Sequence, residues 1–72
     1  MNLLARKIVS DNIKALRQQA GYKREELSLM IGCDNSYISK LEKYRINISI
    51  DKLKELAEVF GVELRDLFKI NN

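Results

Sequence analysis

The sequence predicts an all-α fold of five helices, and two observations indicate it. Apolar residues recur three and four positions apart in two long stretches, which places them on one face of a helix. These residues are Val9, Ile13, Leu16 and Ala20 near the start of the chain, and Leu53, Leu56, Ala57 and Phe60 nearer its end. The glycines at positions 21, 32 and 61 stand where helical segments are expected to end, and glycine supplies the left-handed backbone that closes helices. We therefore expect residues 1–72 to form one compact helical domain.

The first helix is expected to span Leu3–Ala20 and to end at Gly21. Ser10 and Asp11 are good helix caps, so a shorter helix that leaves residues 1–9 as an arm or an extra turn stays open. The polar side of this helix carries three cations, which we interpret as a solvated surface: Arg6, Lys7 and Lys14.

Two short helices, 24–31 and 35–43, are expected next, joined by the tight linker 32–34. Gly32 allows the left-handed backbone that ends the first of them, and Asp34 is a good N-cap for the second. The inner stripe of the 24–31 helix is expected to consist of Leu27, Met30 and Ile31. Two helices joined this way cross steeply and leave the second one exposed.

The 35–43 helix has two different faces. Ile38 and Leu41 point toward the expected core. The opposite face is polar and consists of Asn35, Ser36, Ser39 and Lys40. This arrangement leaves an exposed surface that can form hydrogen bonds.

Two further helices complete the expected fold. Ser49 can cap the fourth helix, which should end at Gly61. The segment 63–68 is expected to form a last short helix with three large apolar residues, Leu64, Leu67 and Phe68. These residues can close the core, but a helix this short leaves some apolar surface exposed, and exposed apolar patches mark partner surfaces.

The composition excludes several classes of protein. With Cys33 as its one cysteine and no histidine, the chain has no internal disulfide, no ligand set for zinc and no histidine-based active site. It also lacks a phosphate-binding glycine loop and a carboxylate pair placed as acid and base, so we expect no enzyme, cofactor or small-molecule ligand. No apolar run approaches the roughly 18 residues of a membrane span. A cytoplasmic protein is therefore expected.

The charge distribution indicates a polyanionic partner for the first part of the chain. The net charge is +3. Residues 1–45 hold nine basic and five acidic side chains, whereas residues 46–72 hold four basic and five acidic ones. The basic excess therefore lies with the two short helices.

The pattern L-x-x-x-I-G-x-x-x-x-x-I-x-x-L-E, which runs from Leu27 to Glu42, resembles the helix-turn-helix of the phage-repressor and Cro type of DNA-binding regulators. This family is also called the xenobiotic-response-element family. The resemblance extends from about Val9 to Phe68 and includes Tyr37–Ile38–Ser39. It implies a lambda-repressor-like fold with the helix-turn-helix at about residues 24–43.

The resemblance implies that the start of the 35–43 helix lies in the major groove of DNA. The residues that match base-facing positions of the family are Asn35, Ser36 and Lys40, with Ser39 beside them. The candidate phosphate contacts are Lys23, Arg24, Tyr37, Lys43 and Arg45. Lys23 and Arg24 depart from the family, which prefers Ser or Thr followed by Gln, so solvated surface charge is the alternative for them. Tyr37 has an alternative role, covering the junction of the two short helices.

The resemblance also implies three structural features. Arg17 and Glu42 match positions that form a partly buried ion pair holding the recognition helix, and Arg17 has a phosphate contact as its alternative. Cys33 takes an aliphatic turn position and is expected in the core, with a reactive or sensing thiol as the alternative. The exit from the 35–43 helix lacks the family's glycine and proline, and Asn47 is the best local candidate for a left-handed residue.

The predicted function is a sequence-specific transcriptional regulator, of the repressor or controller type, that binds a palindromic double-stranded DNA operator as a homodimer. The candidate dimer interface consists of Leu64, Leu67, Phe68 and Ile70, with core closure as the alternative. An antitoxin with a protein partner, the DNA-binding part of a longer repressor, and a protein-interaction adaptor that binds no DNA stay open as other interpretations. The polar face of the 35–43 helix disfavours the adaptor, because protein-binding helices present aromatic or aliphatic anchors.

Overall fold

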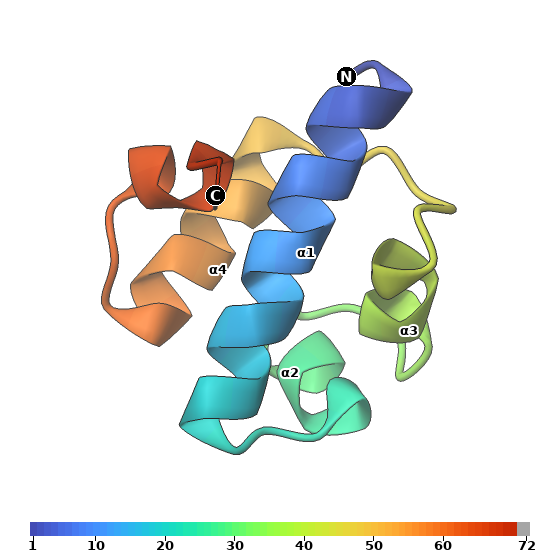
Figure 1. The fold of residues 1–72 in the computed structure, drawn as a ribbon. Coiled ribbons are helices and arrows are strands. Elements are labelled where there is room, and N and C mark those ends of the chain that lie inside the picture. The colour runs from blue at the N-terminus through green and yellow to red at the C-terminus, as the bar shows by residue number, and fades with distance from the viewer. Residues whose placement is uncertain (71–72) are drawn as a thin grey trace.

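A computed structural model describes residues 1–70, and this part of the chain contains four α-helices and one short 3₁₀ helix (Figure 1). Their bounds are α1 Leu3–Ala20, α2 Arg24–Met30, α3 Tyr37–Glu42, α4 Ile50–Phe60 and η1 Leu64–Phe68. Helix α1 runs through the middle, with α2 and α3 on one side and α4 and η1 on the other (Figure 1). It packs against α3, α4 and η1, and α2 packs against α3. The last two residues of the predicted domain, 71 and 72, lie outside the described residues.

The expected fifth α-helix is a single 3₁₀ segment. The backbone N–H of Asp66 donates to the carbonyl of Glu63 at 2.9 Å, which is the three-residue spacing of a 3₁₀ helix. The side chain of Asp66 in turn accepts from the N–H of Glu63 at 2.9 Å. Five residues supply too few hydrogen bonds to nucleate an α-helix, and 3₁₀ geometry is common in such short pieces.

Local caps define both ends of the two long helices; the caps at Gly21, Ser49 and Gly61 are those the sequence predicts, whereas the cap at Asn2 is not. Asn2 caps the N-terminus of α1 with its side-chain oxygen, and Ser49 does the same for α4. Gly21 and Gly61 close these helices with φ angles of 80° and 67°. Because α1 is continuous from Leu3, the alternative of a shorter first helix is wrong.

Helix α3 begins two residues later than expected. The side chain of Asp34 accepts a hydrogen bond from the N–H of Ser36 at 2.9 Å and another from its hydroxyl at 2.7 Å. The N–H of Tyr37 donates to the carbonyl of Asp34 at 3.2 Å. Asp34 therefore stabilises a turn that holds residues 35 and 36, and the helix starts after this turn, at Tyr37.

The core is assembled from all five elements and from the segment before α4. Its buried apolar residues are Val9, Ile13, Leu27, Ile31, Ile38, Leu41, Ile48, Leu53, Leu56, Ala57 and Leu67. Cys33 is half-buried and packs against this core. The expected inner stripe of α2 is wrong at Met30, which is 48% exposed. Met30 lines an open hollow between the end of α2 and α4, so it stays outside the closed core.

Buried polar groups fix the elements relative to one another. The hydroxyl of Ser28 accepts from the N–H of Ile38 at 3.0 Å, which satisfies a free backbone donor at the start of α3. The side-chain amide of Asn12 donates to the carbonyl of Leu67 at 2.8 Å and so ties η1 to α1. Lys52 on α4 donates to the carbonyl of Ile31, at the end of α2. The first of these bonds joins the consecutive helices α2 and α3, and the other two join elements that lie further apart in the sequence.

None of the helices within residues 1–70 is both long enough and apolar enough to span a membrane.

Candidate nucleic-acid interface

Helix α3 and the turn before it present the polar face that the sequence predicts. Ile38 and Leu41 are fully buried in the core. On the opposite side, Asn35 and Lys40 are exposed, and Ser36 and Ser39 are half-buried; this is the complete set of predicted base-contacting residues. Their amide, hydroxyl and ammonium groups can donate to base edges, and the amide and hydroxyl oxygens can also accept.

A polar hollow lies between the start of α2 and the start of α3. It is lined by Arg17, Lys23, Arg24, Glu25, Asn35, Ser36 and Ser39. The structure thus brings predicted base contacts together with two predicted phosphate contacts, while Lys40, Lys43 and Arg45 lie outside this lining. The sequence analysis missed Glu25, whose carboxylate adds a hydrogen-bond acceptor to an otherwise cationic rim.

Asp34 determines what the side chain of Ser36 can offer to a ligand. Because the Ser36 hydroxyl and backbone N–H both donate to its carboxylate, the pKa of Asp34 lies below its usual value, and the group stays ionised. The hydroxyl proton of Ser36 is thereby occupied. The lone pairs of Ser36 remain free, so this side chain is oriented to accept a hydrogen bond.

The buried carboxylate of Glu42 binds two arginines. Its side chain is 5% exposed. One oxygen accepts from the Nε of Arg17 at 2.7 Å, and the other accepts from the Nε of Arg24 at 3.0 Å. The Arg17–Glu42 ion pair therefore forms as expected, and Glu42 connects α1, α2 and α3.

The two arginines differ in how much of the guanidinium group is left for a ligand. Arg17 also donates to the carbonyl of Tyr22 at 2.8 Å, and its side chain is only 10% exposed. Arg24 is 54% exposed and has its Nε bound to Glu42. The terminal N–H groups of Arg24 are therefore available, whereas Arg17 acts mainly inside the protein. The sequence analysis missed the bond between Arg24 and Glu42, because the resemblance assigns Glu42 to Arg17.

Tyr37 lies at the junction of the helix-turn-helix. It is half-buried and packs against the core. Burial raises the pKa of its hydroxyl, with smaller effects from Cys33, Lys52 and Glu55. These neighbours belong to the turn and to α4, so the surroundings of Tyr37 match its alternative role as a cover for the junction. Its phosphate contact stays a prediction.

The exit from α3 turns at Tyr44. This residue has a φ of 61°, so the expectation of a left-handed Asn47 is wrong. The hydroxyl of Tyr44 donates to Asp11 at 2.7 Å, and this bond raises the pKa of the tyrosine. A side-chain contact 33 residues away in sequence thus stabilises the turn. Lys43 and Arg45, on either side of Tyr44, are exposed.

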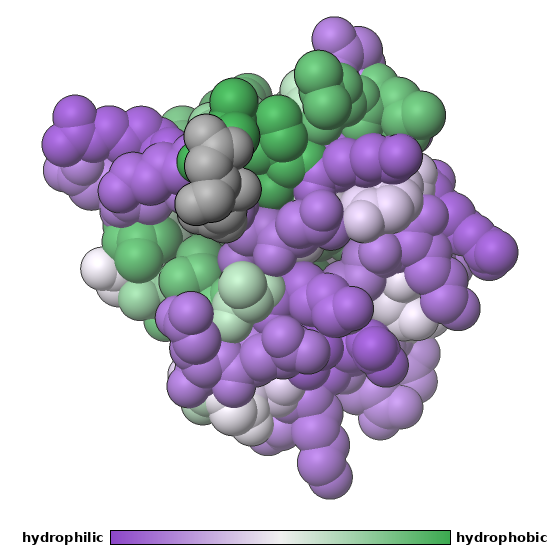
Figure 2. All heavy atoms as spheres, viewed as in Figure 1, coloured by the Kyte–Doolittle hydropathy of each residue, from purple (hydrophilic) through white to green (hydrophobic). Residues whose placement is uncertain are grey.

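The candidate dimer residues divide between the core and the surface. Leu67 is fully buried, so its assignment to an interface is wrong; the bond from Asn12 to its carbonyl holds it against α1. Phe68 and Ile70 are 39% and 70% exposed, and Leu64 is half-buried. Hydrophobic side chains also gather over the first turns of α1, whereas hydrophilic ones cover most of α2 and α3 (Figure 2). Besides Met30, five other apolar residues are exposed that the sequence did not indicate: Met1, Leu3, Leu4, Leu29 and Ile50.

In the described part of the chain, no three or more cysteine, aspartate or glutamate side chains lie close enough to hold a metal ion. The polar hollow instead combines arginine, lysine, amide and hydroxyl groups on a helix-turn-helix. This combination defines the class of DNA-binding domains that insert a recognition helix into the major groove.

Comparison with known proteins identifies the family. The model of a helix-turn-helix family, HTH_3, matches residues 13–67. An HTH-type transcriptional regulator of Sinorhizobium fredii, y4dJ, is 39% identical over 57 residues, which are 79% of this chain and 74% of that protein. A hypothetical transcription factor of Neisseria meningitidis is 32% identical over 57 residues, 79% of this chain and 54% of that protein. The chain thus spans only about half the length of the Neisseria protein.

Solved structures are similar over most of their length. The crystal structure of the transcription factor NHTF from Neisseria superposes with a TM-score of 0.85 and 27% identity, covering 96% of this chain and 80% of that one. The restriction-modification controller protein C.AhdI from Aeromonas hydrophila gives a TM-score of 0.82 and 27% identity over 92% of this chain and 96% of that one. The chain belongs to the Cro/XRE-type helix-turn-helix family of DNA-binding transcriptional regulators.

Replacing Glu42 by alanine tests whether its carboxylate holds the helix-turn-helix together. The change leaves the guanidinium of Arg17 buried without its partner, so we expect the free energy of unfolding to fall by about 3–5 kcal/mol. Chemical denaturation measures this loss.

Arg65→Ala is the matched control, because Arg65 forms an ion pair with Glu63 in which both side chains are mostly exposed. It should not change the stability measurably. Equal effects of the two substitutions would contradict a central role for Glu42.

Proposed function

We propose that this protein is a repressor or controller-type regulator that binds a twofold-symmetric DNA operator as a homodimer. Each protomer inserts the start of α3 into a major groove, and the two recognition helices lie about 34 Å apart on one face of the duplex. The observation that carries this proposal is the exposed polar face of α3, which is continuous with the basic start of α2 across one hollow.

The polar side chains on the exposed face of α3 support direct hydrogen bonding to base edges. Asn35 is exposed, and its amide can pair with the N6 and N7 atoms of adenine. Lys40 is exposed one helical turn further on and can donate to O6 and N7 of guanine. Ser36 and Ser39 lie between them, and Ser36 is oriented to accept, which suits an exocyclic amino group. Together these side chains give each half-site a pattern of donors and acceptors.

Cations on two sides of α3 support backbone contacts. At the start of α2, Lys23 is exposed, so its ammonium can approach a phosphate. Arg24 beside it keeps its terminal N–H groups free. Beyond the end of α3, Lys43 and Arg45 are exposed. Phosphate contacts on both sides would hold the recognition helix in register with the base pairs.

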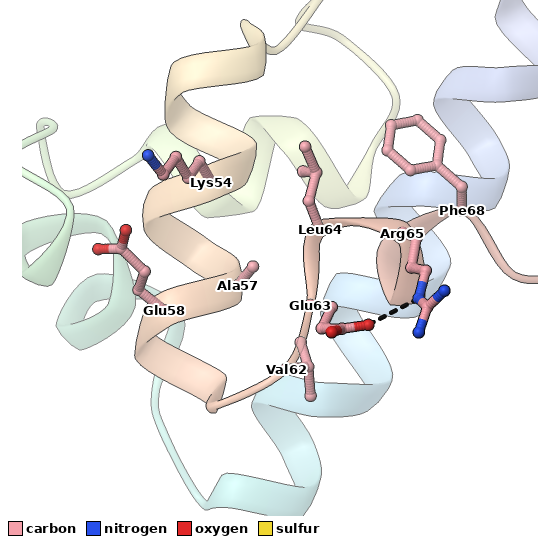
Figure 3. A pocket seen from close by; sticks show the side chains of 8 residues that line it. All are labelled: Lys54, Ala57, Glu58, Val62, Glu63, Leu64, Arg65 and Phe68. Carbon is pink, nitrogen blue, oxygen red and sulfur yellow. Dashed lines mark hydrogen bonds and ion pairs between the residues drawn. The ribbon is translucent and has the colours of Figure 1, made fainter.

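A second copy of the chain is the occupant we propose for an apolar hollow on α4 and η1. The hollow is lined by Lys54, Ala57, Glu58, Val62, Glu63, Leu64, Arg65 and Phe68. Figure 3 shows the side chains of Ala57 and Leu64 between charged groups that belong to α4 and to the η1 segment. This rim carries two basic and two acidic residues, so a twofold axis can pair the same surface with itself. Phe68 is the large apolar side chain available to fill it, with Leu64 and Ile70 nearby in the chain.

The similarity to C.AhdI supports the controller type of regulator in particular, because it covers nearly the whole of both chains. Such a regulator would act where the DNA is, in the cytoplasm.

Selection from random duplex DNA tests the proposed function. Purified protein should enrich an inverted repeat with half-sites about one helical turn apart when binding is carried out at about 150 mM salt. Sequencing of the bound fraction shows the motif and thereby gives the operator. Enrichment of an asymmetric single site would contradict the homodimer, and the absence of any enriched motif would contradict sequence-specific binding.

Alanine substitutions on the selected operator distinguish base contacts from phosphate contacts. Lys40→Ala should relax the preference at one base pair per half-site, at a cost of about 1–3 kcal/mol. Arg45→Ala should weaken binding to all sequences alike. The slope of log K against log salt concentration should become shallower by about one for each half-site. Titrations on operator and mutated operators measure both effects. A sequence-selective loss with Arg45→Ala would contradict these assigned roles.

Replacing Phe68 by glutamate tests the proposed dimer face. A charge placed in the apolar hollow should shift the protein toward monomer and weaken operator binding, because one half-site alone supplies half of the contacts. Sedimentation velocity reports the change in assembly. Leu29→Glu is the matched control, since Leu29 is 64% exposed on α2, away from the hollow. If both variants sediment like the wild type, the dimer uses another surface or does not form.

A further inference from the structure

Tyr44 occupies a backbone conformation that usually belongs to glycine. Within residues 1–70 it is the single non-glycine residue with positive φ, at 61°. The N–H groups of Tyr44 and Arg45 donate to the carbonyls of Leu41 and Lys40, each at 3.0 Å. This is the Schellman pattern, in which the left-handed position after a helix favours glycine because a Cβ atom is strained there. The presence of tyrosine therefore needs a compensating interaction.

Helix α1 supplies that interaction at three points. The carboxylate of Asp11 accepts from the hydroxyl of Tyr44 at 2.7 Å. The guanidinium of Arg6 donates to the backbone carbonyl of Tyr44 at 3.5 Å, and the ammonium of Lys7 lies 5.6 Å from the centre of its ring. We call these three contacts the Tyr44 clamp. The contacts of Asp11 and Lys7 require an aromatic side chain with a hydroxyl group, so glycine could not replace tyrosine in them, whereas Arg6 binds the backbone.

The N-terminal part of α1 lies next to the segment that connects α3 to α4 (Figure 1). The terminal amino group of Met1, which precedes α1, also donates to the side chain of Asn47 at 3.0 Å, so the start of the chain holds the segment at a second place. Arg6, Lys7 and Asp11 precede residue 13, where the match to the family model begins. The α1 residues of the clamp therefore precede the matched region, whereas Tyr44 lies within it.

We propose that Asp11, through Tyr44, is a positioning residue for DNA binding. The clamp holds the exit turn of α3 in one conformation, so that Lys43 and Arg45 meet the phosphates without a further loss of conformational entropy. This inference rests on the phosphate contacts of the proposed function.

Because Asp11 is charged, the proposal can be tested by whether DNA affinity rises or falls when this residue is replaced. A carboxylate near two phosphate-binding cations repels DNA, so removing it from a merely solvated surface would strengthen binding. If Asp11 instead positions the turn, its removal must weaken binding. The two possibilities predict opposite changes for Asp11→Ala.

Operator affinity is measured for Asp11→Ala, Tyr44→Phe and the double variant, by titration at several salt concentrations. Each single variant should bind about 3- to 10-fold more weakly, the range expected for one lost hydrogen bond. The double variant should bind no more weakly than the worse single variant, because both changes remove the same contact. The slope of log K against log salt concentration should become shallower, since the lost affinity comes from phosphate contacts. Unchanged or stronger binding by Asp11→Ala would overturn the proposal.

Two further variants separate positioning from simple loss of folding. Tyr44→Gly suits the left-handed backbone and should stay folded by circular dichroism, yet it should bind as weakly as Asp11→Ala because the clamp is gone. Tyr22→Phe is the matched control: Tyr22 is half-buried, none of the hydrogen bonds found in residues 1–70 uses its hydroxyl, and binding should not change. If Tyr44→Gly binds the operator as tightly as the wild type, the proposed role of the clamp in DNA binding is wrong.

Arg45→Ala distinguishes the failure of this inference from the failure of the proposed function. If Arg45→Ala binds like the wild type, the proposed phosphate contact of Arg45 is wrong, and the proposal that the clamp positions this contact is overturned with it. If Arg45→Ala binds more weakly while the clamp variants bind like the wild type, the clamp alone is overturned and the phosphate contact stands.

Discussion

The arrangement of the helix-turn-helix depends on one buried carboxylate. Glu42 lies at the end of α3 and is shared between Arg17 of α1 and Arg24 of α2. A buried charge is costly unless its partners are close and well oriented, so the fold is favourable only when three helices meet at this point. The same contact orients Arg24 at the rim of the polar hollow. The docking of the three helices and the orientation of Arg24 therefore both depend on the carboxylate of Glu42.

Neither of the two short helices can be stable by itself. Helices α2 and α3 have seven and six residues, well below the length at which isolated helices form in water. Their ends are satisfied by groups from elsewhere: Ser28 accepts the N–H of Ile38, and Lys52 of α4 donates to the carbonyl of Ile31. The recognition surface is thus a product of tertiary packing, and it is rigid to the extent that these contacts persist.

The surface is divided in a way that suits a dimeric DNA-binding protein. Hydrophilic side chains cover most of α2 and α3, and apolar ones gather near the start of α1 (Figure 2). The hollow that contains Phe68 lies on α4 and η1, away from the polar hollow that contains Asn35. Under the proposed function, separate surfaces for DNA and for a second copy would let both contacts form at once. The exit turn at Tyr44 is bound to Asp11 of α1, so the long first helix also reaches the DNA-binding part of the molecule.

The sequence by itself determined the features that depend on neighbours within about four residues. The end of α1, the end of α4 and the caps at Ser49, Gly21 and Gly61 follow from side chains and backbone in the same turn. The outward position of Ser39 and Lys40 follows from helical periodicity, whereas Asn35 and Ser36 lie in the turn that Asp34 stabilises before the helix. These signals are local, and the tertiary structure leaves them unchanged.

Only the tertiary structure decided the features that depend on distant partners. Leu67 is fully buried in the assembled core, and Asn12, 55 residues earlier, binds its carbonyl. Tyr44 rather than Asn47 is left-handed, and Asp11, 33 residues earlier, accepts a hydrogen bond from its hydroxyl. Glu42 binds a second arginine because α2 and α3 pack together. No spacing rule encodes such contacts, since each one exists only after the helices have docked, and their combined geometry is what turns a recognisable helix pattern into a DNA-binding surface.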